Sequence, residues 1–282
     1  MITTRFAPSP TGRLHLGHAY SAILGHRRAR QSRGRFLLRI EDLDATRSRS
    51  EFVAGIGEDL RWLGIDWDGA PLVQSQRTAA YEAALDELRD RGLAYACFCT
   101  RADIARSLTA PHGDAATTYP GTCRGLPDDP RRRSTQPHSW RLDCAKALEI
   151  AGLPTWHEGD GRQFEARRDD IGDAVLARKD APASYHLACV VDDSASGVTM
   201  VVRGADLRPS TPVQRLLQDL LGLPEPVYIH HPLVTHEDGR RLAKRDQAPT
   251  LAAMREAGID GQRLADALAR DKLPLGFAFD EV

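Results

Sequence analysis

Apolar residues near the start of the chain follow two different spacings. Residues 2–6 (ITTRF) predict a short strand, and the prolines and glycine that follow them predict a loop. Between about His15 and Gln31 the apolar residues recur every three or four positions, which predicts a helix. Residues 35–40 (RFLLRI) predict a buried strand. A strand, a glycine-containing loop, a helix and a strand in this order are typical of the beginning of a nucleotide-binding sheet.

Alternating helical and extended patterns continue through the rest of the chain. Amphipathic helices are predicted over residues 51–63, 79–91 and 212–221. Strands are predicted over residues 174–177, 185–191, 198–202 and 228–234, with the polar residues 192–197 (DDSASG) as a hairpin turn. From residue 250 the pattern predicts a charged helical tail.

Residues 97–137 interrupt this regularity. They are rich in Pro, Gly, Asp and Arg and have weak apolar periodicity. This predicts an inserted module that needs a cross-link in addition to its own packing. The expected fold is α/β, a doubly wound, mostly parallel Rossmann-like sheet split by an insertion. Four parts are expected: residues 1–96 as the first half of the catalytic domain, 97–137 as the module, 138–247 as the rest of the insertion and the second half, and 248–282 as a short helical tail.

Composition narrows the possible classes of protein. The 282 residues are 41% apolar and carry a net charge of −1, which argues against a protein that coats nucleic acid nonspecifically. The first ten residues contain no apolar signal segment, and no window approaches ~18 uninterrupted apolar residues, so no membrane span is expected. Five cysteines without an export signal indicate a reduced, cytoplasmic setting, in which clustered cysteines more often bind metal.

The loop over residues 8–18 is the most informative segment. A loop that leaves a strand and enters a helix offers free backbone N–H groups to phosphate, and Gly17 allows a bound ring to approach the backbone. His15 and His18 are three residues apart and share one face of the first helical turn, where they can donate hydrogen bonds to a phosphoryl group. Two surface histidines on an ordinary helix are the alternative, which the surrounding loop disfavours.

A second basic segment lies far along the chain, over residues 240–245 (RRLAKR). A flexible cationic loop that contains Lys244 can close on a polyphosphate and engage its transition state. Taken alone, such a run is usually a solvated loop. Together with the first loop, it indicates a site for a polyphosphate.

Both segments resemble signatures of the class I aminoacyl-tRNA synthetases. Residues 15–18 stand as the HIGH signature, and residues 241–245 are similar to a degenerate KMSKS signature. The chain is more specifically similar to the glutamyl branch, through blocks that occur in family order over about residues 1–247. These blocks are RFAPSPTG from residue 5, RIEDLD from 39, WLGIDW from 62, QSQR from 74, SYHLA from 184, VDD from 191 and RGADL from 203.

A glutamate pocket needs cations for two carboxylates and an anion for the ammonium. Arg5, Arg203 and Glu41 lie at the ends of predicted strands, where ligands bind in such sheets, and Tyr185 can add a hydrogen bond. A structural ion pair between Arg5 and Glu41 is the alternative. The resemblance implies a glutamate site of Arg5, Phe6, Ala7, Pro8, Ser9, Glu41, Tyr185 and Arg203, an ATP site of His15, Gly17, His18 and Lys244, and catalysis by His15, His18 and Lys244. Cys189 stands where some glutamyl enzymes carry Asn, which puts that contact in doubt.

Three cysteines form the remaining candidate site. Cys97 and Cys99 can bind one zinc ion, and Cys123 can close the loop as a third ligand. The chemistry leaves the fourth ligand open among Tyr119, His112 and Asp114. The resemblance, here to a truncated branch of the glutamyl family, implies Cys97, Cys99, Tyr119 and Cys123 as the zinc ligands. Packed free cysteines are the alternative.

The resemblance implies a reaction in two steps. Glutamate and ATP with Mg²⁺ would form glutamyl-adenylate without tRNA, and glutamate would pass to the queuosine base in the anticodon of tRNA(Asp). The chain ends about 35 residues after the loop that contains Lys244, so we expect no anticodon-binding domain. We also expect a monomer. The alternatives are a minimal glutamyl-tRNA synthetase that charges the 3′ end of tRNA(Glu), another nucleotidyltransferase, and a regulatory paralogue that has lost catalysis.

Overall fold

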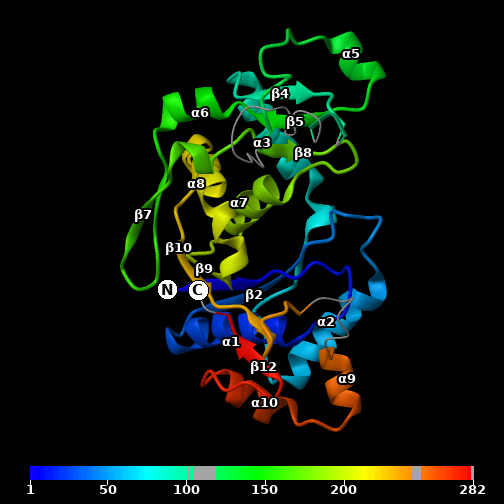
Figure 1. Cartoon of the computed structure of the whole chain (residues 1–282), viewed down its shortest axis with the longest axis vertical. Coiled ribbons are helices and arrows are strands. Elements are labelled where there is room, and N and C mark those ends of the chain that lie inside the picture. The colour runs from blue at the N-terminus through cyan, green and yellow to red at the C-terminus, as the bar shows by residue number, and fades with distance from the viewer. Residues whose placement is uncertain (101, 105–118, 243–248, 281–282) are drawn as a thin grey trace.

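A computed structural model describes residues 1–100, 102–104, 119–242 and 249–280. Its central strands, in the middle of Figure 1, pair in parallel, as predicted for the first part of the chain. Strands β1 (Thr3–Phe6), β2 (Arg35–Ile40) and β3 (Leu72–Val73) form one sheet, and β9 (Met200–Gly204) pairs with β10 (Val227–His231). The amide of Thr199 donates to the carbonyl of Thr3 at 2.9 Å, which brings the two sheets side by side.

Helices bury their apolar faces on both parts of this parallel core. Helix α1 (Leu16–Gln31) packs with α2 (Ser50–Trp62) and β2 in one cluster of buried residues. Helices α3 (Thr78–Asp90) and α8 (Thr211–Leu220) belong to a second cluster, which extends into the insertion. Short 3-10 turns at Gln74–Gln76, Arg168–Asp170 and Ala205–Ser210 connect these elements.

One predicted strand is wrong. Residues 185–191 belong to helix α7 (Tyr185–Ala195), and residues 192–197 end that helix instead of forming a hairpin turn. The side chain of Ser184 caps the helix by accepting from the amide of Leu187 at 3.4 Å. Leu187 and Val190 are buried, so packing overrides the strand preference of the valine pair.

The insertion forms a sheet of its own, seen in the upper part of Figure 1. Strands β4 (Ala94–Cys97), β5 (Ser139–Leu142) and β8 (Val175–Ala177) pair antiparallel in that order. Helix α5 (Pro130–Thr135) precedes β5, and helix α6 (Cys144–Ala151) follows it. A hairpin of β6 (Thr155–His157) and β7 (Gln163–Glu165) comes next along the chain. The four-part division of the chain stays a prediction.

The end of the chain is not purely helical, which corrects the predicted tail. Helices α9 (Leu251–Glu256) and α10 (Gly261–Leu268) are followed by strand β12 (Phe277–Phe279). Strand β12 pairs antiparallel with β11 (Val234–His236), so the tail returns to the core. Residues 228–234, predicted as one strand, are divided between β10 and β11, with Pro232 between them. Across the described ranges, each helix is too short or too polar to cross a membrane.

Candidate active site

The predicted glutamate and nucleotide residues line one cavity of about 720 Å³. It opens at the carboxyl ends of β1, β2 and β9 and at the first turns of α1 and α7. The cavity brings together Arg5, Phe6, Ala7, Pro8, Ser9, His15, Gly17, His18, Glu41, Tyr185 and Arg203. Lys244 lies outside the described residues, although Arg241 and Leu242 of the same basic segment reach the cavity wall.

The two histidines cap helix α1. Nδ1 of His15 accepts from the amide of Gly17, and Nδ1 of His18 accepts from the amide of His15, each at 3.2 Å. Their ring centroids are 3.8 Å apart, so both lie at the first helical turn as predicted. Burial lowers the pKa of His15 to about 4, so its ring is neutral near pH 7. Because Nδ1 accepts, the proton sits on Nε2, where the ring can donate a hydrogen bond to an oxygen in the cavity.

A buried carboxylate holds two arginines beneath this cavity. Asp193 Oδ1 accepts from Nε of Arg5 at 3.0 Å and from a terminal nitrogen of Arg39. The side chains of Arg5, Arg39 and Asp193 are only 6%, 3% and 5% exposed. Although burial alone would raise it, Arg39 and Arg5 hold the pKa of Asp193 well below its usual range. The arrangement is therefore a permanent ion cluster.

Glu41 belongs to the same cluster, but through Arg39. Nη2 of Arg39 lies 3.1 Å from Oε1 of Glu41. The alternative of an ion pair between Arg5 and Glu41 is wrong, because Arg5 pairs with Asp193 instead. Burial raises the pKa of Glu41, and Arg39 opposes this effect. Glu41 remains in the cavity wall, where its carboxylate can accept from an ammonium group.

Sequence reasoning missed Arg39 and Asp193. The signals were present, since Arg39 interrupts the apolar run of residues 35–40 and Asp193 follows the apolar residues of 187–191. A charge within an apolar run is expected to be paired, but the sequence gives no indication of the partner.

Arg203 has a different environment from Arg5 and Arg39. Its guanidinium donates to Gln214 Oε1 at 2.7 Å, to Thr211 Oγ1 at 2.8 Å and to the hydroxyl of Tyr185 at 3.3 Å. Its Nε donates to Nε2 of His230 at 3.2 Å. All four of these partners are neutral. No carboxylate among the described residues forms an ion pair with Arg203, although this residue is only 3% exposed.

His230 is itself fixed in a neutral form. Its Nδ1 lies 2.7 Å from Oε1 of Glu158, so the proton belongs on Nδ1 and Nε2 accepts from Arg203. Burial is the largest effect on its pKa and, with Arg203, lowers it to about 4. Arg203 therefore lines the cavity without a carboxylate partner among the residues that the structure describes, which favours an anionic ligand there.

Cys189 lies among the buried charges and does not line the cavity. Its thiol donates to Asp193 Oδ2 at 3.5 Å and lies 3.5 Å from Nη2 of Arg39. Burial raises the pKa of Cys189 to about 11, so it stays a thiol at neutral pH. In this chain position 189 therefore supports the arginines through the carboxylate of Asp193.

The three predicted cysteine ligands meet in the insertion. Their Sγ atoms lie within 4.8 Å of one another, and those of Cys99 and Cys123 are 3.6 Å apart. The hydroxyl of Tyr119 is 3.4 Å from Sγ of both Cys97 and Cys99. The other two candidates for the fourth ligand, His112 and Asp114, lie outside the described residues. Three sulfurs and one phenolic oxygen at this spacing could hold one metal ion.

Comparisons with known proteins identify the family of the chain. The sequence model of the catalytic domain of class I tRNA synthetases (E and Q) matches residues 1–273. Glutamyl-Q tRNA(Asp) synthetase from Rhodobacter capsulatus is 48% identical over 271 residues, which are 91% of this chain and 96% of that protein. The protein of that name from Nocardia farcinica is also 48% identical, over 96% of this chain and 84% of its own.

Solved structures show the same fold. Glutamate-tRNA synthetase from Elizabethkingia anophelis superposes with a TM-score of 0.80 at 26% identity, over 95% of this chain. A glutamate tRNA ligase from Elizabethkingia meningosepticum in complex with its amino acid gives the same TM-score and identity. The chain spans 61% and 60% of the lengths of these two structures.

The ion cluster makes a prediction about stability. Replacing Asp193 with Asn leaves Arg5 and Arg39 buried without their shared carboxylate, so the free energy of unfolding should fall by about 3–5 kcal/mol. Urea unfolding followed by circular dichroism measures the change. Asp160→Asn is the matched control, because Asp160 pairs with Arg162 on the surface and should matter little. Equal stability of the two variants would contradict the role given to Asp193.

Proposed function

Because the chain belongs to the class I tRNA synthetases (E and Q), we propose that it is a ligase that activates glutamate with ATP and transfers it to the queuosine base of tRNA(Asp). The synthetase class rests on the family match over residues 1–273. The acceptor rests on relatives named glutamyl-Q tRNA(Asp) synthetase, which are 43–48% identical to most of the chain.

The observation that carries the choice of substrate is the uncompensated charge of Arg203. A buried guanidinium with neutral partners favours a ligand that brings its own carboxylate. Glu41, on the same cavity wall, suits the ammonium of an amino acid. Arg5 lines the same cavity and adds positive potential at the second carboxylate. Its Nε donates to Asp193, and its Nη2 lies near Cys189. The segment Phe6–Ser9 forms the side of the pocket between these groups.

The chemistry proposed at the other end of the cavity is adenylate formation. A carboxylate oxygen of glutamate attacks the α-phosphorus of ATP, the bond to the bridging oxygen breaks, and pyrophosphate leaves. His15 and His18 donate hydrogen bonds to the phosphoryl oxygens, Gly17 permits close approach of the nucleotide, and Lys244 adds charge from the basic loop. Mg²⁺ enters as part of the ATP substrate. The second step joins a queuosine hydroxyl to the activated carbonyl and releases AMP.

The cysteine cluster is proposed to hold one structural zinc ion. Cys97, Cys99, Cys123 and Tyr119 offer four ligands of the type and spacing that zinc accepts. Because all four positions would be protein atoms, the ion would stabilise the insertion and take no part in the reaction. Three expectations stay predictions: that the enzyme is a monomer, that it is cytoplasmic, and that it lacks an anticodon-binding domain.

Glutamate activation should need no tRNA. Protein, Mg²⁺, ATP and glutamate should support ATP–pyrophosphate exchange, because the pocket is complete within this chain. Arg203→Gln should lower kcat/KM for glutamate by about 100-fold or more, since a buried charged partner of the carboxylate is removed. Arg162→Gln, a surface arginine outside the cavity, serves as the control. Exchange that depends strictly on added tRNA, or that survives Arg203→Gln, would refute the assignment.

The acceptor is tested by locating the transferred glutamate. With labelled glutamate, tRNA(Asp) that contains queuosine should become labelled, and tRNA(Asp) without queuosine should not. Nuclease mapping and periodate treatment place the label in the anticodon loop or on the terminal adenosine. Label on the terminal adenosine of tRNA(Glu) would indicate a minimal tRNA-charging enzyme instead.

Protein purified without chelators should contain about one zinc ion per chain, as a single four-ligand site requires. Cys97→Ser should lose the metal and lower the thermal stability of the insertion, because a ligand is missing. Cys144→Ser is the matched control, since Cys144 is buried outside the cluster and its thiol donates to the carbonyl of Ile171. Metal content near zero in the unaltered protein would defeat the proposal.

A further inference from the structure

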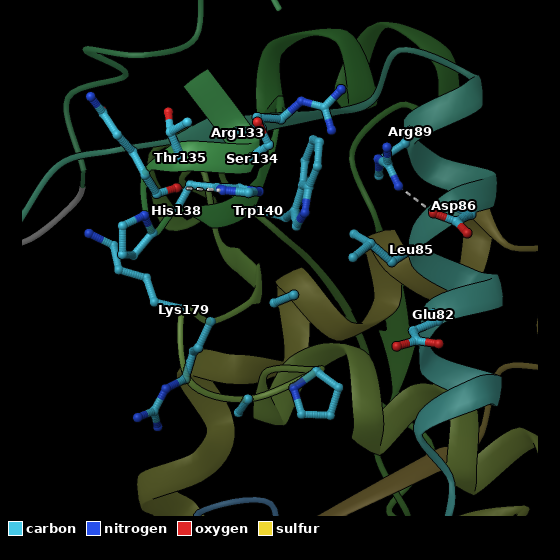
Figure 2. Close-up of a pocket in the computed structure, with 16 residues that line it drawn as sticks. Glu82, Leu85, Asp86, Arg89, Arg133, Ser134, Thr135, His138, Trp140 and Lys179 are labelled. Carbon is cyan, nitrogen blue, oxygen red and sulfur yellow. Dashed lines mark hydrogen bonds and ion pairs between the residues drawn. The ribbon is translucent and has the colours of Figure 1, made fainter. Parts of the chain in front are cut away.

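A second cavity, of about 730 Å³, lies between helix α3 and the insertion sheet, away from the candidate active site. Its walls come from three separated segments: α3 from Glu82 to Arg89, residues 133–140 at the start of β5, and residues 177–182 after β8. We call this cavity the α3–β5 groove (Figure 2). No role proposed above uses it.

The groove has an aromatic wall on an apolar floor. Trp140 faces it beside His138, and the two rings meet edge to face with centroids 5.4 Å apart. The guanidinium of Arg89 lies over the Trp140 ring at 4.3 Å, and that of Arg133 lies at 5.5 Å. Leu85 forms part of the floor. Aromatic rings combined with arginine planes are the groups on which unpaired bases of RNA stack.

The charges around the groove are unevenly distributed. Figure 2 shows the carboxylates Glu82 and Asp86 on α3 and Lys179 on the opposite side. Arg133 and Arg178 pair with Asp128 and Asp180, which are surface carboxylates that a phosphate can replace at small cost. Arg89 pairs with Asp86 within α3 itself, on the side that also carries Glu82. The Lys179 ammonium donates to the backbone carbonyl of Cys99 at 3.3 Å and has no carboxylate partner among the described residues. An anion is therefore favoured on the side of the 178–179 loop.

The segment that borders the groove leads directly along the chain into the candidate active site. Residues 177–182 form its edge, and Ser184 and Tyr185 begin helix α7 directly after them. Tyr185 lines the candidate active-site cavity. A strand of RNA held at the groove would thus be held by the segment that leads into the site.

We propose that the α3–β5 groove binds one unpaired nucleotide of the RNA substrate, with its base against Trp140 and its phosphate beside Lys179. The proposal rests on the proposed function, because it takes the partner to be RNA. The acidic side formed by α3 fixes the orientation, since Glu82 and Asp86 repel a phosphate there. An acidic protein segment would satisfy the cations but would not need the flat ring of Trp140.

The test measures binding of queuosine-containing tRNA(Asp) at several salt concentrations. Lys179→Gln should weaken binding and reduce the slope of log K against log salt by about one, because one phosphate contact is lost. Trp140→Leu should weaken binding about fivefold or more, the effect expected for loss of one stacked base. Glutamate-dependent pyrophosphate exchange without tRNA should be unchanged in both variants, which shows that they are folded.

Arg263→Gln provides the matched control. Arg263 is an 88% exposed cation on α10, at the opposite end of the molecule from β5 and β8 in Figure 1, and its loss should leave binding unchanged. Unaltered affinity in Trp140→Leu, with exchange intact, would overturn the proposal whatever Lys179→Gln does. If Trp140→Leu does not fold, an unaltered salt slope in Lys179→Gln would overturn it. Loss of exchange in the unaltered protein would instead count against the proposed function.

Discussion

The carboxylates of Asp192 and Asp193 join the parts of the chain on which the candidate site is built. Asp193 binds Arg5 on β1 and Arg39 on β2, although 188 and 154 residues separate these pairs. Asp192, fully buried, accepts from Gln74 at 2.9 Å and from the hydroxyl of Tyr81 at 2.8 Å, and so reaches the 3-10 turn and α3. Two successive residues of α7 therefore fix the first half of the chain against the second. Buried charges tolerate little displacement, because separation leaves each without compensation.

This constraint explains why Arg5 and Arg39 differ in role from Arg203. Arg5 and Arg39 share a carboxylate, so their charge is largely used within the protein. Arg203 is held in place by Gln214, Thr211 and a neutral His230, so its position is fixed while its charge remains available. Rigid placement of a charge that has no carboxylate partner among the described residues reduces the cost of organising the site when the substrate binds.

The sequence predicted the local features of the site better than its long-range ones. The loop over residues 8–18 and the helix after it could be recognised because proline, glycine and apolar spacing act locally. Helix α7 was missed because Val190 and Val191 favour a strand, while Ser184 and burial in the second core cluster decide for a helix. The partners of Arg5 and Arg203 could not be predicted, since no local spacing relates residues that far apart. The α3–β5 groove could not be predicted for the same reason, because three segments far apart in the sequence form it.

The described part of residues 97–137 has a physical reason to depend on the cysteine cluster. Helix α5 buries no residue, and Cys97, Tyr119 and Cys123 form only a small apolar core. So little buried apolar surface cannot offset the entropy of ordering the backbone there, so additional bonds are needed to fix it. Lys179 is tied to the backbone carbonyl of Cys99, within this cluster. The proposed metal ion would therefore fix the backbone to which Lys179 donates, and so link the cysteine cluster to one edge of the α3–β5 groove.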